Sequence, residues 1–324
     1  MNIKHILAIT TLFLILFSAC SKDEPEVTPF DHLGQATIDD DLLREYLETH
    51  FYTPPTGNDN FGILDTIENG ETPLINQVIT KDIEYGDVDY KIYLLKNTPI
   101  GVGEAPLLID SAYVNYKGQL LNATIFDSND SYFWANLYGG VIPGWSYALP
   151  SYNEGVNTSQ IGLPISFNQT GKGVFFLPSG LAYRESARSL IPASSPLIFH
   201  IEMAMVKRND PDRDGILAVY EDLNNDLIVK NDDTDGDETP DFIDFDDDGD
   251  KLSTVYEDAD PNNDGNPNDA LDTDGDNTPN YLDNDDDGDG ILTADENSDP
   301  NLDGNPDDAK DTDGDDIPDY LDAN

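Results

Sequence analysis

The chain has 324 residues, 38% of them hydrophobic, which is enough apolar material for one or two packed cores and argues against disorder throughout. Its formal net charge is −50, but residues 209–324 hold 42 of the 66 Asp and Glu and only 4 of the 16 Lys and Arg. Such an acidic surface repels nucleic acid and anionic lipid headgroups, so cations are the expected partners of this part of the chain.

The N-terminus is typical of an export signal. Residues 1–19 combine Lys4, an apolar run from Ile6 to Phe17 that is too short to span a bilayer, and small residues before Cys20. Because Cys20 is the single cysteine, no disulfide within the chain is expected to stabilise the exported protein.

The stretch FSAC that ends at Cys20 resembles the lipobox of bacterial lipoproteins, with Phe17 in place of the usual Leu. The resemblance implies a lipidated Cys20 and a membrane anchor; the alternative is an uncleaved anchor with an idle thiol. Residues 21–24, SKDE, are similar to the export signal of Bacteroidota surface lipoproteins. We therefore expect a lipid anchor in the outer membrane, with the protein on either the cell surface or the periplasmic face.

The next segments are expected to be a tether and an N-terminal extension. Residues 20–36 are polar and contain proline, which predicts a tether, whereas TIDDDLLREYLETH from Thr37 predicts a helix capped by Thr37 or Asp39. Residues 51–75 are rich in Pro, Gly, Asn and Thr and predict a loop. The extension, residues 37–80, is expected to pack an extra helix on a sheet that includes strands at 89–96 and 111–118.

Four motifs then follow in order, AYVNYKGQLLNATIFDS (112–128), VIPGW (141–145), LPSGLAY (177–183) and IPASSPLIFHIEMAMV (191–206). Together they resemble the FKBP-type peptidyl-prolyl isomerase family over roughly residues 80–207. The resemblance implies an α+β fold for residues 81–208, in which a bent antiparallel sheet wraps around one short helix. It also implies an aromatic pocket on the concave face of the sheet, and catalysis without a cofactor.

Nine positions match the pocket of that family: Tyr116, Phe126, Asp127, Val141, Ile142, Trp145, Tyr183, Ile191 and Phe199. The resemblance implies that Trp145 forms the floor, with Phe126 and Phe199 as walls. A further aromatic wall is expected from residues 132–136, where the choice among Tyr132, Phe133 and Trp134 stays open.

The resemblance also assigns polar roles. The Tyr183 hydroxyl and the Ile142 backbone N–H are the expected donors to substrate carbonyls, and Asp127 is expected at the rim, facing the amide carbonyl. Rotation of a prolyl amide crosses a barrier of about 20 kcal/mol, and the twisted amide is less dipolar than the planar one. A dry aromatic cavity therefore suits this reaction, although aromatic residues on strands are often core residues only.

Two departures from the family lie at the expected pocket rim. The chain between Trp145 and Tyr183 is about fifteen residues longer than in small family members, which predicts an extra hairpin or loop. RESARSL (184–190) stands where the family has a loop histidine. Both departures affect the expected substrate preference.

The acidic part, residues 209–324, contains an internal repeat. DTDGDETPDFID, DTDGDNTPNYLD and DTDGDDIPDYLD begin at residues 233, 272 and 311, which is a period of 39 residues. Between them, DPDRDGILAVYE (210–221), DDDGDKLSTVYE (246–257) and DDDGDGILTADE (285–296) fit a twelve-residue calcium loop with oxygen ligands at positions 1, 3, 5, 7 and 12.

The candidate calcium ligands of the first and third loops are Asp210, Asp212, Asp214, the carbonyl of Ile216 and Glu221, and Asp285, Asp287, Asp289, the carbonyl of Ile291 and Glu296. Those of the second loop are Asp246, Asp248, Asp250 and Glu257. Lys251 replaces the turn glycine of the other loops there, which makes the second site the weaker prediction. The region resembles thrombospondin type 3 repeats with EF-hand-like loops, which implies a helix-poor structure wound around calcium; the alternative is a disordered acidic tail.

Three functions are compatible with this sequence. The first is a lipid-anchored peptidyl-prolyl cis-trans isomerase that acts on Xaa-Pro segments of exported proteins and has structural calcium in its C-terminal repeats. The second is a surface binding or adhesion protein that holds Pro-containing ligands without turnover, and the third is a calcium-gated chaperone. The repeats are distal to the anchor, so they either project toward a partner or pack back on the preceding domain.

Overall fold

The computed structural model describes residues 29–56, 61–97, 100–226 and 228–323. The predicted signal peptide, Cys20 and most of the predicted tether therefore lie outside the described residues. Within the described part, no helix combines the length and the apolar character needed to cross a membrane.

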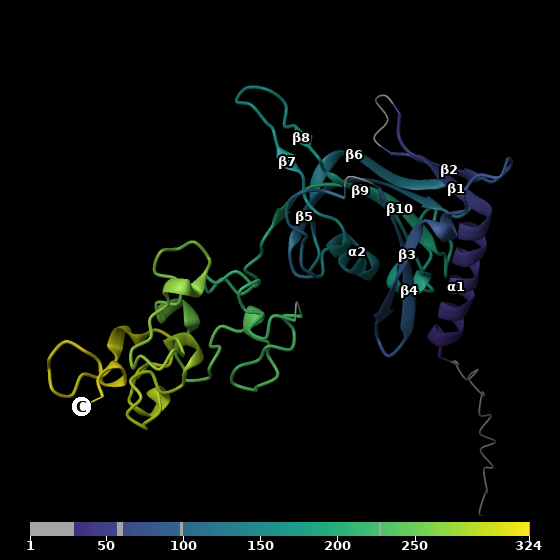
Figure 1. Ribbon diagram of the computed structural model, residues 1–324. Coiled ribbons are helices and arrows are strands. Elements are labelled where there is room, and N and C mark those ends of the chain that lie inside the picture. Colours follow the sequence, from purple (N-terminus) through teal and green to yellow (C-terminus); the bar gives the residue numbers. More distant parts are fainter. Residues whose placement is uncertain (1–28, 57–60, 98–99, 227, 324) are drawn as a thin grey trace, which may run out of the picture. The chain divides into compact units, whose positions relative to one another are not determined.

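A bent six-stranded sheet forms the centre of the fold and holds the short helix α2 (Pro143–Ala148) in its hollow (Figure 1). In sheet order the strands are β3 (Val78–Glu84), β4 (Asp89–Asn97), β9 (Gly171–Leu177), β10 (Leu197–Lys207), β5 (Ser111–Leu120) and β6 (Ile125–Asn136). Every neighbouring pair is antiparallel. This is the expected α+β architecture; β4 and β5 confirm the two predicted strands, and the sheet begins three residues before the predicted boundary at residue 81.

The two central strands, β9 and β10, are buried on both faces, because their nearly continuous apolar residues place side chains on each face in turn. Phe175 and Phe199 are paired across these strands and face α2, where they join the larger hydrophobic core. Phe176 and Ile198 are the next pair and point to the opposite face, into a second core. The sheet is therefore the middle layer between two packed cores.

The second core is built by the N-terminal extension, as predicted. Leu43 and Leu47 of α1 (His32–Thr49) and Leu74 are fully buried against this face of the sheet. The segment predicted as a loop, 51–75, is wrong in part, because it contributes to a small hairpin of β1 (His50–Thr53) and β2 (Ile63–Thr66) and ends in a short 3-10 turn.

The predicted start of the N-terminal helix is wrong. The helix begins at His32, so residues 32–36 are not tether, and neither Thr37 nor Asp39 is a cap. Asp39 is fully buried in mid-helix and accepts hydrogen bonds from the Ser179 backbone N–H and hydroxyl, both at 2.6 Å. Burial raises the pKa of this carboxyl despite these bonds. Tertiary contacts therefore decide the helix register, and they tie α1 to the turn that precedes Tyr183.

A buried histidine on the face opposite α2 gives a testable pH dependence. His200 is 1% exposed, and neither ring nitrogen has a partner among the described residues. Burial, and secondarily the charge of Lys117, lowers the pKa of His200 to about 3. The unfolded chain takes up this proton below about pH 6.5 and the native chain does not, so stability falls as pH decreases from 6.5 toward 3.

We expect His200→Leu to remove about 2 kcal/mol of the loss in unfolding free energy between about pH 7.5 and 5. Urea unfolding at saturating calcium, for the parent and the variant at both pH values, measures this difference. Equal losses for the two proteins would contradict the assignment.

The inserted segment between α2 and β9 forms the predicted extra hairpin, with β7 (Val156–Asn157) paired to β8 (Phe167–Asn168). Its base is held by Phe167, whose ring lies 5.3 Å from that of Tyr132 and 6.0 Å from that of Tyr113. The hairpin is therefore mounted on the sheet through aromatic contacts.

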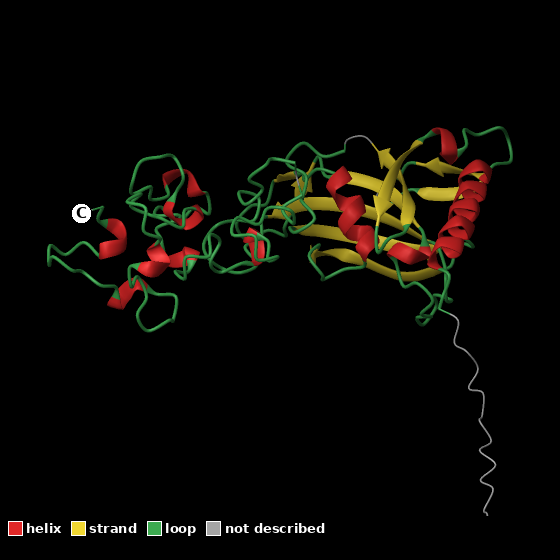
Figure 2. Ribbon diagram, turned by 90° about the horizontal axis from the view of Figure 1, so that it is seen from below, coloured by secondary structure: helices red, strands yellow, loops and turns green. Residues whose placement is uncertain are grey.

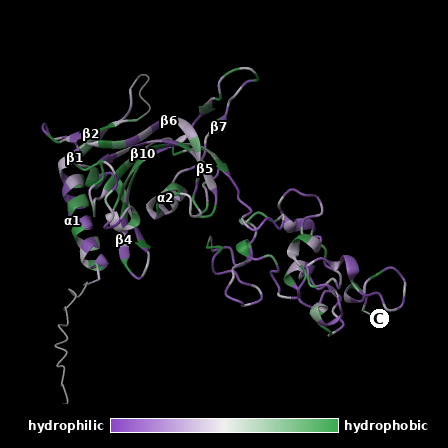
Figure 3. Cartoon of the chain, turned by 180° about the vertical axis from the view of Figure 1, so that it is seen from behind, coloured by the Kyte–Doolittle hydropathy of each residue, from purple (hydrophilic) through white to green (hydrophobic). Residues whose placement is uncertain are grey.

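The acidic region contains no strand among its described residues and is built from loops and short 3-10 turns (Figure 2). Its colouring in Figure 3 is mostly hydrophilic, with isolated apolar residues. Three of these, Phe242, Tyr281 and Tyr320, recur every 39 residues and are 1%, 4% and 7% exposed. The preceding residue of each, Asp241, Asn280 and Asp319, accepts a hydrogen bond from a threonine backbone N–H. The sequence repeat is thus a structural repeat.

The first part of this region packs on the preceding domain. Ile109 forms a small core with Ala218, Val229 and Phe242. The Asn209 side-chain amide donates a hydrogen bond to the Ile109 backbone carbonyl at 2.5 Å. Of the two arrangements expected for the repeats, the contacts of this first part favour packing back on the domain.

Candidate active site and acidic clusters

A cavity of about 310 Å³ lies at the concave face of the sheet. All nine residues that the sequence predicts for the pocket line it: Tyr116, Phe126, Asp127, Val141, Ile142, Trp145, Tyr183, Ile191 and Phe199. Four residues that were not predicted with certainty complete the lining, namely Phe133, Arg188, Ser189 and Leu190. The structure therefore brings together positions from five separate segments of the chain.

Adjacent strands supply the aromatic walls. Tyr116 lies on β5, Phe126 on β6 and Phe199 on β10, with Phe126 and Phe199 in edge-to-face contact at 5.5 Å between ring centroids. Gly118 of β5 is the register partner of both Asp127 and Phe199. A Cβ at this glycine would lie 2.5 Å from the Phe126 ring, so the absence of a side chain lets the two phenyl rings meet.

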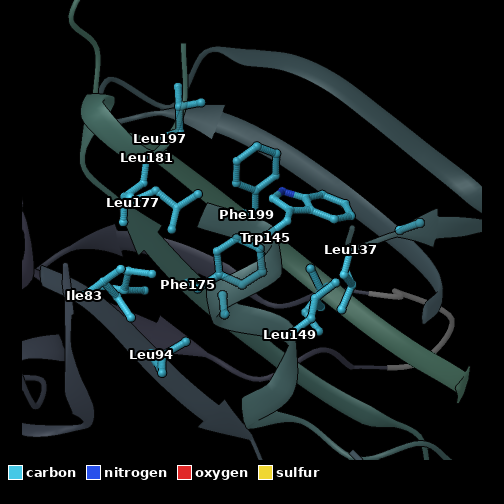
Figure 4. Packing of buried hydrophobic residues seen from close by; sticks show 14 of the residues in the cluster. Ile83, Leu94, Leu137, Trp145, Leu149, Phe175, Leu177, Leu181, Leu197 and Phe199 are labelled. Atoms are coloured by element: carbon cyan, nitrogen blue, oxygen red, sulfur yellow. The ribbon is translucent and has the colours of Figure 1, made fainter. Parts of the chain in front are cut away.

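Trp145 is delivered by the first turn of α2. Pro143 begins the helix with a suitable φ angle, and the Trp145 N–H donates to the Ile142 carbonyl at 2.9 Å. The indole is 4% exposed and meets Tyr116 and Phe199 edge to face, at 5.1 and 5.3 Å between ring centroids. Figure 4 shows Trp145 beside Phe199 and Phe175 in the core. Its position beneath the cavity matches the predicted floor.

The cavity has few polar groups, and two of its possible donors make no hydrogen bond within the described chain. The Tyr116 hydroxyl donates to Asp127 at 2.5 Å, and burial together with this carboxylate raises the pKa of Tyr116. Within the described chain, the Ile142 N–H and the Tyr183 hydroxyl have no hydrogen-bond partner, so both are available as donors. The cavity thus offers two donors and one anchored carboxylate in an aromatic surround.

Of the three aromatic candidates in residues 132–134, Phe133 lines the cavity. Its ring lies 5.6 Å from Tyr116 and 6.3 Å from Trp145. Tyr132 and Trp134 point to the other face of β6, where their rings lie 5.3 and 4.9 Å from that of Tyr113. The pairing of Phe133 with the buried Val114 is the structural signal that separates it from its neighbours.

The acidic region gathers carboxylates into compact groups. Asp248, Asp250, Glu257 and Asp286 have one oxygen each within 4.8 Å of the others. Further groups with the same property are Asp210, Asp212 and Asp214; Asp214, Glu221 and Asp247; Asp233, Asp235 and Asp237; and Asp272, Asp274 and Asp276. Most of the predicted ligands of the first two loops therefore lie close together.

Two members of these groups were not predicted. Asp247 joins Asp214 and Glu221 of the first loop, and Asp286 joins the second loop, so each is the second residue of the following loop. Asp246, a predicted ligand, is outside the second-loop group; its carboxylate accepts hydrogen bonds from the Gly249 and Lys251 N–H groups. A ligand pattern that is defined within one loop omits the ligands that the following loop contributes.

Lys251 takes the backbone conformation of the turn glycine that it replaces, and the second site as the weaker one stays a prediction. Lys251 adopts a φ of 82°, in the left-handed region that Gly215 and Gly290 use at 109° and 93°. The turn is therefore kept without glycine, at a cost of order 1 kcal/mol. The predicted carbonyl ligands Ile216 and Ile291 stay predictions.

The clusters are suited to a hard cation. Glu221, Asp247, Glu257 and Asp286 are at most 5% exposed, and neither carboxylate oxygen of any of them has a hydrogen-bond partner among the described residues. Burial, followed by neighbouring carboxylates, raises the pKa of Glu221 to about 11 and that of Asp247 to about 9. Buried anions of this kind require a compensating charge, and an oxygen-only donor set fits calcium.

Comparisons with known proteins match the part of the chain that forms the cavity. A family model described as FKBP-type peptidyl-prolyl cis-trans isomerase matches residues 103–204, and one described as BamM C-terminal matches residues 211–269. The FKBP-type isomerase FkpA of Aeromonas hydrophila is 34% identical over 120 residues, which are 36% of this chain and 38% of FkpA. The isomerase Mip of Coxiella burnetii is 31% identical over 111 residues, which are 33% of this chain and 42% of Mip.

Among solved structures, FkpA of Escherichia coli aligns with 31% identity and a TM-score of 0.30, over 36% of this chain and 48% of that one. The chain thus spans less than half the length of the curated relatives that it matches. The family match covers β5, β6, α2, β9 and most of β10, and it includes every predicted pocket residue. Residues 103–204 of the chain are therefore similar to the FKBP-type peptidyl-prolyl cis-trans isomerase family.

Proposed function

We propose that this protein is a peptidyl-prolyl cis-trans isomerase that acts on Xaa-Pro segments of exported proteins. The observation that carries the proposal is the single cavity lined by all nine matching residues, floored by Trp145 and equipped with two unengaged donors. Curated relatives of the matched domain bear the name of this activity.

In the proposed mechanism the proline ring enters the cavity between Phe126, Phe199 and the Trp145 floor. The Ile142 N–H and the Tyr183 hydroxyl bind substrate carbonyls and hold the peptide while the prolyl C–N bond rotates. The aromatic surround excludes water, so the less dipolar twisted amide is bound better than the planar one, and the barrier of about 20 kcal/mol falls. The Asp127 carboxylate, held by Tyr116, faces the amide from the rim.

Cis-trans exchange of Xaa-Pro peptides, measured by NMR exchange spectroscopy with the chain from Ser21 onward, tests this proposal. Isomerase activity predicts exchange that accelerates in proportion to protein concentration. Peptide binding with unchanged exchange rates would instead make the protein a binding module that holds Pro-containing ligands without turnover.

We further propose that calcium is the structural core of residues 209–324. The buried carboxylates without partners, in groups that join successive loops, support this assignment. Asp248, Asp250, Glu257 and Asp286 would hold one ion, and Asp214, Glu221 and Asp247 would contribute to another. Bound calcium would neutralise these groups and so stabilise the turns around them.

The location is proposed from the sequence alone. We propose that lipidated Cys20 anchors the protein in the outer membrane of a bacterium. Mass spectrometry of the N-terminal peptide of the protein purified from membranes should show a diacylglyceryl group on Cys20, and Cys20→Ser should release the protein from the membrane fraction. An unmodified peptide that still contains residues 1–19 would contradict this proposal.

A further inference from the structure

The rim of the candidate pocket carries a positive side chain in a strongly acidic protein. Arg188 lines the cavity, and its guanidinium carbon lies 5.8 Å from the ring centroid of Tyr183. Tyr183 supplies one of the two unengaged donors that would bind a substrate carbonyl. The cation therefore lies beside a group that would contact the substrate backbone.

The backbone holds this cation at the rim. The Arg188 N–H donates to the Ile191 carbonyl at 2.8 Å, and the Ile191 N–H donates to the Arg188 carbonyl at 2.5 Å. Ser189 and Leu190 form the tip of this tight turn. Because Ile191 is 6% exposed and packs in the core, the turn is fixed at its base and presents Arg188 toward the cavity mouth.

The Arg188 guanidinium is available to a ligand. No ion pair between Arg188 and a carboxylate occurs in the described parts of the chain, although the chain has a net charge of −50. The carboxylate that lines the cavity, Asp127, accepts its hydrogen bond from Tyr116 instead. A planar guanidinium without an ion-pair partner is well suited to a carboxylate, which it can bind through two parallel hydrogen bonds.

We infer that Arg188 makes the pocket prefer prolyl segments with Asp or Glu directly beside the proline. This inference rests on the proposed function, because it concerns the peptides that enter the same cavity. The effect is local, since the many carboxylates elsewhere repel an acidic peptide beyond about 10 Å only weakly at physiological salt. Arg188 is thus a specificity-determining residue at the rim of the cavity.

Two matched pairs of prolyl peptides test the inference, one pair with Glu or Gln directly before the proline and one with Glu or Gln directly after it. Both kcat/KM for exchange and Kd from NMR titration are measured at about 0.15 M salt with the chain from Ser21 onward. We expect the Glu peptide of at least one pair to be favoured by about threefold, as is typical of an exposed ion pair. The preference should decrease toward one in about 0.5 M salt.

Two variants that remove the same charge supply the comparison. Arg188→Gln should abolish the preference. Arg184→Gln should keep it, because Arg184 stacks on Tyr85 at 5.3 Å and does not line the cavity. A ratio of one for both pairs in the parent, or an unchanged ratio in Arg188→Gln, overturns the inference.

The two readouts separate this inference from the proposed function. Accelerated exchange without a Glu preference would contradict the inferred selectivity and support the isomerase activity. A Glu preference in Kd that depends on Arg188, without accelerated exchange, would contradict the isomerase activity and support the inferred selectivity.

Discussion

Trp145→Ala is expected to lower kcat/KM for prolyl exchange by roughly 30-fold, because it removes about 2 kcal/mol of apolar contact with the proline ring in the twisted state. The indole is the floor of the cavity and contacts Tyr116, Phe133 and Phe199, so its loss also enlarges and wets the site. The NMR exchange assay with the chain from Ser21 onward measures the effect.

The same substitution removes a large side chain from the core, which typically costs about 3–5 kcal/mol of unfolding free energy. Leu94→Ala is the matched control, because Leu94 is 1% exposed in the same core and does not line the cavity. We expect Leu94→Ala to destabilise the fold and to leave kcat/KM within about twofold of the parent, provided the protein is assayed well below its melting temperature. Equal activity losses in both variants would show that Trp145 acts only through stability.

Removal of calcium is expected to unfold the acidic repeats and to leave the sheet domain folded. Without the ion, carboxylates such as Glu221 and Asp247 are buried together with no compensating charge. Calcium at about one hundred times Kd contributes about 2.7 kcal/mol for each site that binds only the folded state. Limited proteolysis with and without EDTA should cleave residues 209–324 rapidly only in the chelated sample, while a fragment containing residues 32–208 persists.

Glu257→Gln provides the site-specific form of this test. Glu257 is 5% exposed, and both of its carboxylate oxygens lack a partner in the described chain. We expect this change to weaken calcium binding at the second loop by at least about tenfold, since even loss of a group that orients a ligand costs that much. Glu238→Gln makes the same chemical change at an exposed residue outside the second-loop group and should bind calcium at that group as the parent does. Titration calorimetry measures both, and identical isotherms for the two variants would contradict the assignment.

The sequence predicted the central part of the fold well because its signals are local. The strand patterns at β4 and β5 and the motif positions of the pocket depend on alternation and on short motifs such as VIPGW. The choice of Phe133 over Tyr132 and Trp134 could not be made from the sequence, because the β5–β6 pairing shifts register between Val114 and Tyr116. A bulge of this kind breaks the simple rule that alternate residues share a face.

Other misses depend on contacts between distant residues. The N-terminal helix begins earlier than its capping residues suggest, since Asp39 bonds to Ser179, 140 positions along the chain. Asp247 and Asp286 complete clusters of the preceding loops, so a ligand pattern defined within one loop omits them. In each case the deciding interaction joins segments that no local pattern relates.

Because the sheet has a hydrophobic core on each of its faces, both cores determine how long a fragment of this chain must be to fold. The matched family segment begins at residue 103, but β3, β4 and α1 lie before it and cover strands that the segment contains. In a fragment that begins at residue 103, Val174, Phe176 and Ile198 would form an apolar surface exposed to solvent. β9 would lose its partner β4 and become an edge strand of the sheet. Such a fragment is expected to aggregate. The folding unit of this protein is therefore longer than the segment that matches the family, because α1, β3 and β4 build the second hydrophobic core of the same domain.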